Sequence, residues 1–227
     1  MNGRAMAAAA ALLLVTSASG WGAEPRYVAT YLDVKSASID AGEALSRQYV
    51  RATRAEAGNV SVNAFREIGR PNRFVVIETW TDSAAFADHE KAAHTTEFRQ
   101  KLTLINRSPY DQRVTHGFAV DPAPAVAGPN AVYVVTHVDV PGAQRDEAER
   151  VLRQLFQWSH AGPGHVRFDI YQQDEPRTNH FTMFVVWNNR RAFEDYANTS
   201  QWLQFTQALA PLLGAPYDER LYRPLRP

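Results

Sequence analysis

The sequence predicts an α+β fold of two tandem ferredoxin-like (βαββαβ) domains that pair with each other as a pseudo-dimer. The first observation is an internal repeat: "YVATYLDV" from Tyr27 returns as "YVVTHVDV" from Tyr133, and "SPYDQRV" from Ser108 returns as "APYDERL" from Ala215. The second is the length of each copy, about a hundred residues, which is typical of a domain and too long for a solenoid repeat. The third is "AVDPAPAVAGPN" (119–130), whose Pro and Ala content predicts a semi-rigid linker.

The elements of the first copy follow from local patterns. "RYVATYLDV" is rich in the Val and Tyr that favour strands, and Asp40 can cap a helix that Gly58-Asn59 would stop. "NVSVNAFREI" alternates apolar and polar residues as a half-buried strand does, and "RPN" turns it into "RFVVIETW" as a hairpin. The predicted elements are strand 26–34, helix 39–57, strands 59–68 and 73–80, helices 83–91 and 95–106, and strand 110–118.

The second copy repeats this order. Its predicted elements are strand 131–140, helix 143–160, hairpin 164–187, helices 190–197 and 199–212, and a strand from 216. Helices cover only one face of such a sheet, and leaving the other apolar face in water is unfavourable. We therefore predict that the two copies pack sheet against sheet within one chain.

The N-terminus precedes the fold. A basic start, the apolar run "AMAAAAALLLV" and the small residues that follow predict a signal peptide over 1–22, with cleavage after Gly20 or Gly22 and a periplasmic or secreted protein. The alternative is an uncleaved membrane anchor, for which the apolar run is short. The remaining boundaries are domain 1 at 24–118, the linker at 119–130 and domain 2 at 131–225.

Composition excludes several classes of function. Lys and Arg number 24 and are balanced by 24 Asp and Glu, so no excess of positive charge predicts nucleic-acid binding. The chain has no Cys, which excludes disulfides, thiolate catalysis and cysteine-ligated metal sites. No membrane insertion is expected after signal cleavage, and a further homo-oligomer remains open.

One group of residues in the first copy forms a recognisable motif: Glu78-Thr79-Trp80, Ala85-Phe86, His89 and Phe98. On a βαββαβ unit this pattern resembles the antibiotic biosynthesis monooxygenase family of dimeric α+β barrels. The second copy resembles it less, keeping Trp187, Ala192-Phe193 and Phe205. The resemblance covers nearly all of the mature chain. It implies a cofactor-independent monooxygenase that oxidises hydroquinone-like aromatics with O₂, in a pocket between sheet and helices.

Five residues form the candidate site. Glu78 and Trp80 lie two apart on a strand and share a face. A hydroquinone must lose a proton before it reacts with O₂, and His89 or His94 could take it near neutral pH. Asn63 could bind an oxyanion, and Trp80 could stack on a flat ring. The predicted catalytic residues are His89, Glu78 and His94, and the predicted substrate-binding residues are Trp80 and Asn63.

Each of these residues also has a structural interpretation. Trp80 recurs as Trp187 and fits a core position, His89 could simply tie its helix to Glu78, and Asn63 could lie at a strand edge. The comparison of the copies favours a site in the first copy only. Glu78 is replaced by Val185, His89 by Tyr196 and His94 by Gln201, whereas the Trp and Phe positions are kept.

We predict no cofactor and no metal. His160 and His165 flank a Gly-Pro-Gly turn, but no third ligand is apparent. A haem-degrading relative would need an axial histidine, which His89 or His94 could supply. The first-strand Asn that such enzymes carry is missing from Tyr27 to Val34.

Two classes of function remain. The first is a quinol monooxygenase acting on a small aromatic substrate and O₂. The second is a non-enzymatic periplasmic module that binds a hydrophobic ligand or partner, with a haem-binding relative as a further alternative. An enzyme should have His89 or His94 facing the ligand cavity, whereas a binding module should have an apolar cavity with both histidines outside it.

Overall fold

The computed structural model describes residues 24–122, 127–160 and 162–225, so the predicted signal peptide and linker residues 123–126 lie outside the described residues. The first half of the chain contains β1 (Arg26–Asp33), η1 (Ser36–Ser38), α1 (Ile39–Thr53), β2 (Asn59–Glu67), β3 (Arg73–Trp80), α2 (Ser83–Lys91), α3 (Ala93–Ile105) and β4 (Asp111–Ala119). The second half contains β5 (Val132–Asp139), η2 (Gly142–Gln144), α4 (Arg145–Ser159), β6 (His165–Gln173), β7 (His180–Trp187), α5 (Arg190–Ala197), α6 (Ser200–Leu209), η3 (Ala210–Leu212) and β8 (Asp218–Pro224). Both halves therefore have the predicted βαββαβ order.

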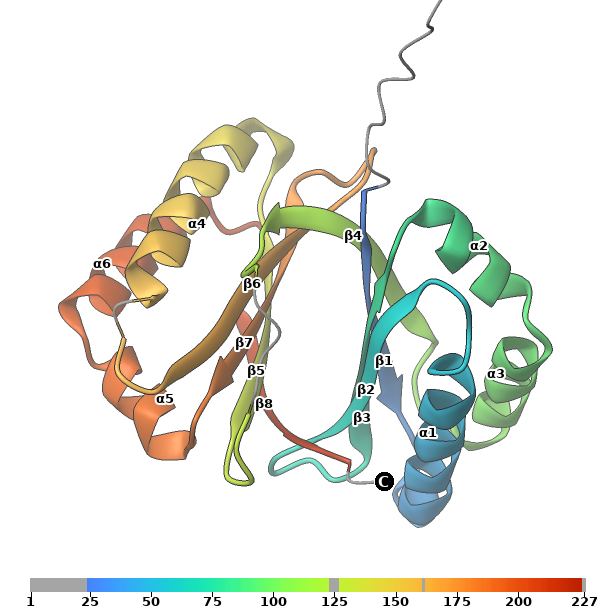
Figure 1. Ribbon diagram of the computed structural model, residues 1–227. Coiled ribbons are helices and arrows are strands. Elements are labelled where there is room, and N and C mark those ends of the chain that lie inside the picture. Colours follow the sequence, from blue (N-terminus) through green and yellow to red (C-terminus); the bar gives the residue numbers. More distant parts are fainter. Residues whose placement is uncertain (1–23, 123–126, 161, 226–227) are drawn as a thin grey trace, which may run out of the picture.

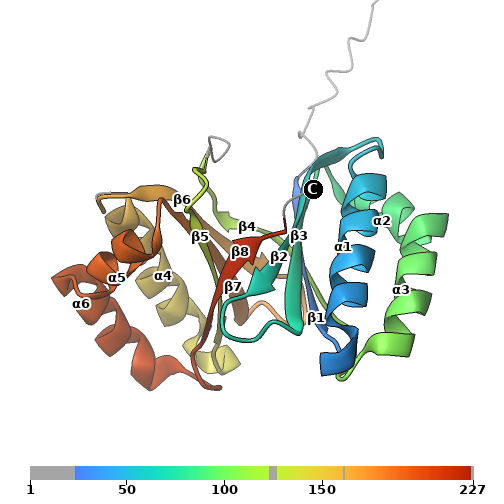
Figure 2. The same ribbon diagram turned by 90° about the horizontal axis from the view of Figure 1, so that it is seen from below.

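The eight strands close into one barrel in the order β1-β3-β2-β8-β5-β7-β6-β4. The last strand of each half joins the halves: β4 pairs with β1 and with β6, and β8 pairs with β5 and with β2. Helices α1 to α3 cover the outside of one half and α4 to α6 the outside of the other, with the strands between them (Figures 1 and 2). The predicted fold class and the pairing of the two copies are confirmed, because each half supplies an edge strand to the other's sheet.

In each half, one glycine packs directly against the helix that follows the third strand. Gly58 and Gly164 both have positive φ, +80° and +82°, and a Cβ on either would lie 2.5 Å from the Cβ of Ala85 or Ala192, respectively. Only glycine fits such a backbone with the following helix packed so closely against it. This contact explains why the Gly and Ala positions recur in both copies.

Side-chain alternation on the strands separates an inner layer from two outer layers. On β3, Val75 and Ile77 belong to a cluster inside the barrel, whereas Phe74 and Val76 pack under the helices of the first half. Glu78 and Trp80 have the same parity as Val76 and so lie on the helix-covered face. The candidate site is therefore outside the barrel, between sheet and helices.

Four helix boundaries differ from the sequence prediction by two residues or more: the end of α1, the beginning of α3, the beginning of α4 and the end of α6. Helix α1 ends at Thr53 rather than at 57, because Ala55 N–H and Glu56 N–H bond back to Ala52 O and Thr53 O in a tighter turn. Helix α4 begins at Arg145, after the 3₁₀ turn η2. Among the described residues, no helix has the length and apolar character needed to cross a bilayer.

Candidate active site

The site lies where β3, α1, α2 and α3 meet. Strand β3 presents Glu78 and Trp80, α1 presents Tyr49, and His89 lies in the last turn of α2. Asp82 begins α2 by accepting a hydrogen bond from Ala85 N–H at 2.8 Å, which fixes where the helix starts. Glu78, Trp80 and His89 are all 0% exposed, so every polar atom among them needs a partner.

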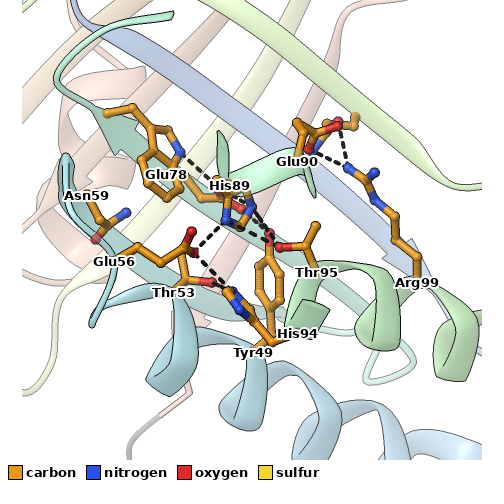
Figure 3. Close-up of polar contacts among 12 residues, drawn as sticks. Tyr49, Thr53, Glu56, Asn59, Glu78, His89, Glu90, His94, Thr95 and Arg99 are labelled. Atoms are coloured by element: carbon orange, nitrogen blue, oxygen red, sulfur yellow. Dashed lines mark hydrogen bonds and ion pairs between the residues drawn. The ribbon is translucent and has the colours of Figure 1, made fainter. Parts of the chain in front are cut away.

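The Tyr49 hydroxyl joins Glu78 to His89. Its oxygen is 2.9 Å from Glu78 Oε1 and 2.7 Å from His89 Nε2, and Trp80 Nε1–H donates to Glu78 Oε2 at 3.0 Å (Figure 3). His89 Nε2 is also 3.6 Å from Glu78 Oε2. The three side chains thus form one continuous polar path inside an apolar shell.

Glu56 and His94 continue this path towards the surface. Glu56 Oε1 is 2.6 Å from His89 Nδ1 and 3.0 Å from His94 Nε2 (Figure 3). Because a carboxylate only accepts, both imidazoles present N–H groups to Glu56. The side chains of Glu56 and His94 are 19% and 26% exposed, so the path runs from the fully buried Glu78 to partly exposed groups.

This geometry allows a proton to move between Glu78 and His89. Burial raises the pKa of Glu78, which favours its protonated form. In that form Glu78 donates to the Tyr49 oxygen and Tyr49 donates to His89 Nε2. Shifting one proton along both bonds gives a Glu78 carboxylate and a His89 imidazolium without any change in the number of protons. Burial also raises the pKa of Tyr49, so its hydroxyl serves as a bridge and does not ionise.

The space beside this network is small. A cavity between α1 and α3 is lined by Tyr49, His94, Phe98 and Lys101, among others, and its volume of about 20 Å³ is enough for roughly one water molecule. All of its lining residues come from these two helices, so it is not the pocket expected between sheet and helices, and it is too small for an aromatic ring. His94 lines it, and the buried His89 lies behind Tyr49 and Glu56.

Asn63 does not belong to this cluster. It lies on β2 opposite Ile77, on the barrel side of the sheet, and its Oδ1 accepts from Arg54 Nη2 at 3.0 Å. It lines a cavity of about 810 Å³ inside the barrel, to which both halves contribute. The grouping of Asn63 with Glu78 and the histidines was therefore wrong: adjacent strands place it on the opposite face.

Two members of the network were missed by the sequence analysis. In the sequence, Tyr49 has the spacing of an ordinary core residue of an amphipathic helix, and Glu56 lies in a segment whose composition predicts a polar turn. Comparison of the copies would have found both, because Tyr49 aligns with Leu155 and Glu56 with Gly162 when Gly58 is placed on Gly164.

The second half fills the equivalent space with aromatic rings. The ring centroid of Tyr196, which replaces His89, is 4.7 Å from that of Trp187 and 5.7 Å from that of Trp202. Val185 stands where Glu78 stands in the first half. The acid–base network is therefore confined to the first half.

The described residues contain two groups of the kind that can hold a metal ion, Glu56 with His89 and His94, and Asp121 with His160 and His165. In the second group the linker residue Asp121 lies beside the two histidines and is a third potential ligand, which is not apparent in the local sequence. For haem the first group is a poor fit: both nitrogens of His89 are hydrogen-bonded, and the adjoining cavity of about 20 Å³ is far smaller than a porphyrin.

Comparisons with known proteins agree with this architecture. The family model described as antibiotic biosynthesis monooxygenase matches residues 25–101 and again 131–208. The Bacillus subtilis (strain 168) protein named "Putative monooxygenase YcnE" is 32% identical over 81 residues, which are 36% of this chain and 85% of that protein.

Two crystal structures resemble nearly the whole chain. One is named as a "putative monooxygenase" of Fusobacterium nucleatum; its TM-score is 0.78 at 14% identity, with 90% of this chain and 94% of that chain covered. The other is an anthrone oxidase-like protein, with a TM-score of 0.70 at 11% identity and coverage of 89% and 92%. At such identities these structures show a common fold.

Proposed function

Because this chain belongs to the antibiotic biosynthesis monooxygenase family, we propose that it is a monooxygenase that oxidises a quinol or related electron-rich aromatic with O₂. The family supports a monooxygenase-type activity. The observation that carries the choice of substrate class is the buried network of Glu78, Tyr49, His89 and Glu56, which ends at His94 on the wall of the small cavity. A substrate that must lose a proton before oxidation needs a base in that place.

In this proposal His94 is the base that contacts the substrate. Its Nε2–H donates to Glu56, so the neutral ring keeps its lone pair at Nδ1, which takes the phenolic proton. The Glu56 carboxylate then stabilises the imidazolium, as the carboxylate of a catalytic triad does. His89, held by Tyr49 and Glu78, positions Glu56 and is a positioning residue, not a catalytic one.

The reaction balances without a bound redox group. The deprotonated quinol supplies the electrons; one oxygen atom of O₂ enters the ring and the other leaves as water, so that quinol plus O₂ gives hydroxyquinone plus water. The protein supplies the base, and Tyr49 and Phe98 supply aromatic walls beside it. The ring enters by displacing α3 from α1 near Phe98, with the non-helical Ala92 between α2 and α3 as the hinge.

An oxygen electrode tests this proposal on the mature protein with a panel of benzo- and naphthohydroquinones. We expect oxygen uptake above autoxidation, lost in His94→Ala and in His89→Ala, and retained in Tyr196→Phe, which changes the matched position of the second half. No uptake over the whole panel would argue against the proposal, and so would equal rates in all three variants.

A second candidate function is the binding of a hydrophobic ligand without chemistry. The observation in its favour is the barrel cavity of about 810 Å³, whose lining includes Tyr27, Phe65, Tyr133 and Phe184 but neither His89 nor His94. Ser61→Trp would place a bulky indole ring in this cavity from β2. If that variant lost ligand binding while no quinol were oxidised by the wild type, the binding function would be favoured.

We also propose that the enzyme works without a cofactor. Purified protein should lack a visible absorption band, and dialysis against EDTA should leave quinol oxidation unchanged. A Soret band at one haem per chain that survives gel filtration, and is lost in His94→Ala, would replace this proposal with the haem alternative.

The proposed location is the periplasm or the medium. The mature protein should begin at Trp21 or Ala23, as read by intact-mass measurement of the exported chain. Retention of residues 1–22 in the membrane fraction would contradict signal cleavage.

A further inference from the structure

Three side chains from separate segments meet outside the candidate active site. Asp121 follows β4, His160 follows α4, and His165 begins β6. His160 Nε2 is 2.5 Å from Asp121 Oδ1, and His165 Nε2 is 3.7 Å from Asp121 Oδ2. One ligand atom from each residue lies within 4.8 Å of the others.

The hydrogen bonds within this cluster leave one buried nitrogen, His165 Nε2, without a partner among the described residues. His160 Nδ1 is 2.7 Å from the Phe156 carbonyl oxygen, which only accepts, so Nδ1 carries a hydrogen. In a neutral ring Nε2 would then turn a lone pair towards the Asp121 carboxylate. His165 Nε2 is buried and has no hydrogen-bond partner within the described part of the chain. An extra proton on His160 would satisfy only the first contact, whereas a metal ion can satisfy both.

We propose that Asp121, His160 and His165 bind one divalent transition-metal cation of the Zn²⁺ type. Two imidazole nitrogens and one carboxylate oxygen form a ligand set that Zn²⁺ and its neighbours in the first transition row accept. Metal–ligand distances of about 2 Å require movements of only about an ångström from the present side-chain positions. His160 is 42% exposed, which leaves a path for the ion and open positions for water.

The surrounding groups already orient the ligands. Asp121 Oδ2 accepts from Phe168 N–H at 2.8 Å, and the Phe156 carbonyl fixes the ring of His160, an arrangement common around metal-bound histidine.

The bound ion would fasten the linker to the second half. Asp121 N–H donates to Asp169 Oδ1 at 3.0 Å, and Asp121, Pro122 and Ala127 form part of the wall of the barrel cavity. The ion therefore acts as a structural clamp at that wall. The other group, Glu56 with His89 and His94, is different because both nitrogens of His89 already have partners.

Zn²⁺ titration of EDTA-treated mature protein tests this site, with binding followed by competition against a chromophoric chelator and thermal unfolding followed in parallel. We expect one Zn²⁺ per chain and a raised Tm. His160→Ala, a substitution at a half-exposed helix end, should weaken binding at least tenfold and remove the rise in Tm. His165→Gln should do the same, with circular dichroism to show that it is folded.

Two variants serve as controls. His180→Ala removes a histidine that lies 2.8 Å from Asp139 and outside the cluster, and His94→Ala removes a ligand of the other group. Both should bind Zn²⁺ like the wild type. The proposal is overturned by absence of saturable binding at micromolar Zn²⁺, by full binding in His160→Ala, or by loss of binding in His94→Ala alone.

Discussion

Replacing Tyr49 by Phe removes one oxygen atom from the centre of the buried network. The Tyr49 oxygen lies 2.9 Å from Glu78 Oε1 and 2.7 Å from His89 Nε2, and the residue is 3% exposed. The ring remains, so its stacking on Phe98 at 4.2 Å is kept. The change is therefore almost purely a loss of two hydrogen bonds.

The expected change in the free energy of unfolding depends on the polar groups that Tyr49→Phe leaves without a partner. A buried polar group without its partner destabilises a protein by about 1–3 kcal/mol, and here both Glu78 and His89 are affected. Their direct separation of 3.6 Å allows some recovery by closer approach. We expect Tyr49→Phe to lower the free energy of unfolding by about 2–4 kcal/mol.

Urea unfolding at pH 7 measures this free energy, and Tyr196→Phe is the matched control. The Tyr196 hydroxyl is buried and has no hydrogen-bond partner among the described residues, so its removal leaves no polar group newly unpaired and should not lower the free energy of unfolding. Equal effects of the two substitutions, or no effect of Tyr49→Phe, would refute the assignment of a hydrogen-bonded network to the first half only.

Four further outcomes are expected. Burial lowers the pKa of His137 from 6.5 to about 3. Stability is therefore lost as pH falls from 6.5 towards 3, because the unfolded chain binds the proton more readily. His137→Gln should reduce this loss, which is followed as the change of Tm between about pH 4 and 7. Burial raises the pKa of Glu219 from 4.5 to about 7. Its contribution to stability is therefore fully present below pH 4.5 and is lost as pH rises through 7. Glu219→Gln should remove this pH-dependent loss of stability. Gly58→Ala should lower the free energy of unfolding in urea more than Gly69→Ala does. Both glycines have positive φ, but only at Gly58 would an added Cβ collide with Ala85. Equal effects of the two substitutions would contradict the close packing of Gly58 against α2. Residues 24–120 expressed alone should aggregate or self-associate in gel filtration, since half a barrel exposes its inner face, and a stable monomer would contradict the closed barrel as the folding unit.

Local patterns predicted the elements well because each depends on few neighbours. The alternation of β3 placed Glu78 and Trp80 on one face, and the predicted helix 83–91 has the bounds of α2. The pairing of the two halves was predicted because leaving the apolar face of each sheet in water is unfavourable. These inferences required only spacing and residue type.

Contacts between distant segments could not be obtained in this way. Both faces of β2 are apolar near Asn63: Val62 packs under the helices and Phe65 packs inside the barrel. The periodicity of the strand therefore could not predict which face would bind a ligand. Glu56 and Asp121 lie in turns and linkers, where no periodicity indicates direction. Their roles depend on which histidines the fold brings to them, and this is set by tertiary structure.

The duplicated frame carries the network only once because such a network is stable only when complete. In a buried chain from Glu78 through Tyr49 and His89 to Glu56, losing one member leaves its neighbours without partners. Replacing all of them by apolar groups can be nearly neutral, since no unpaired polar atom then remains. The second half shows that outcome: Leu155 and Val185 replace the hydrogen-bonding residues, and rings fill the space. The Tyr196 hydroxyl is buried in this cluster without a partner, which indicates that aromatic bulk rather than polarity is what the second half needs at this position.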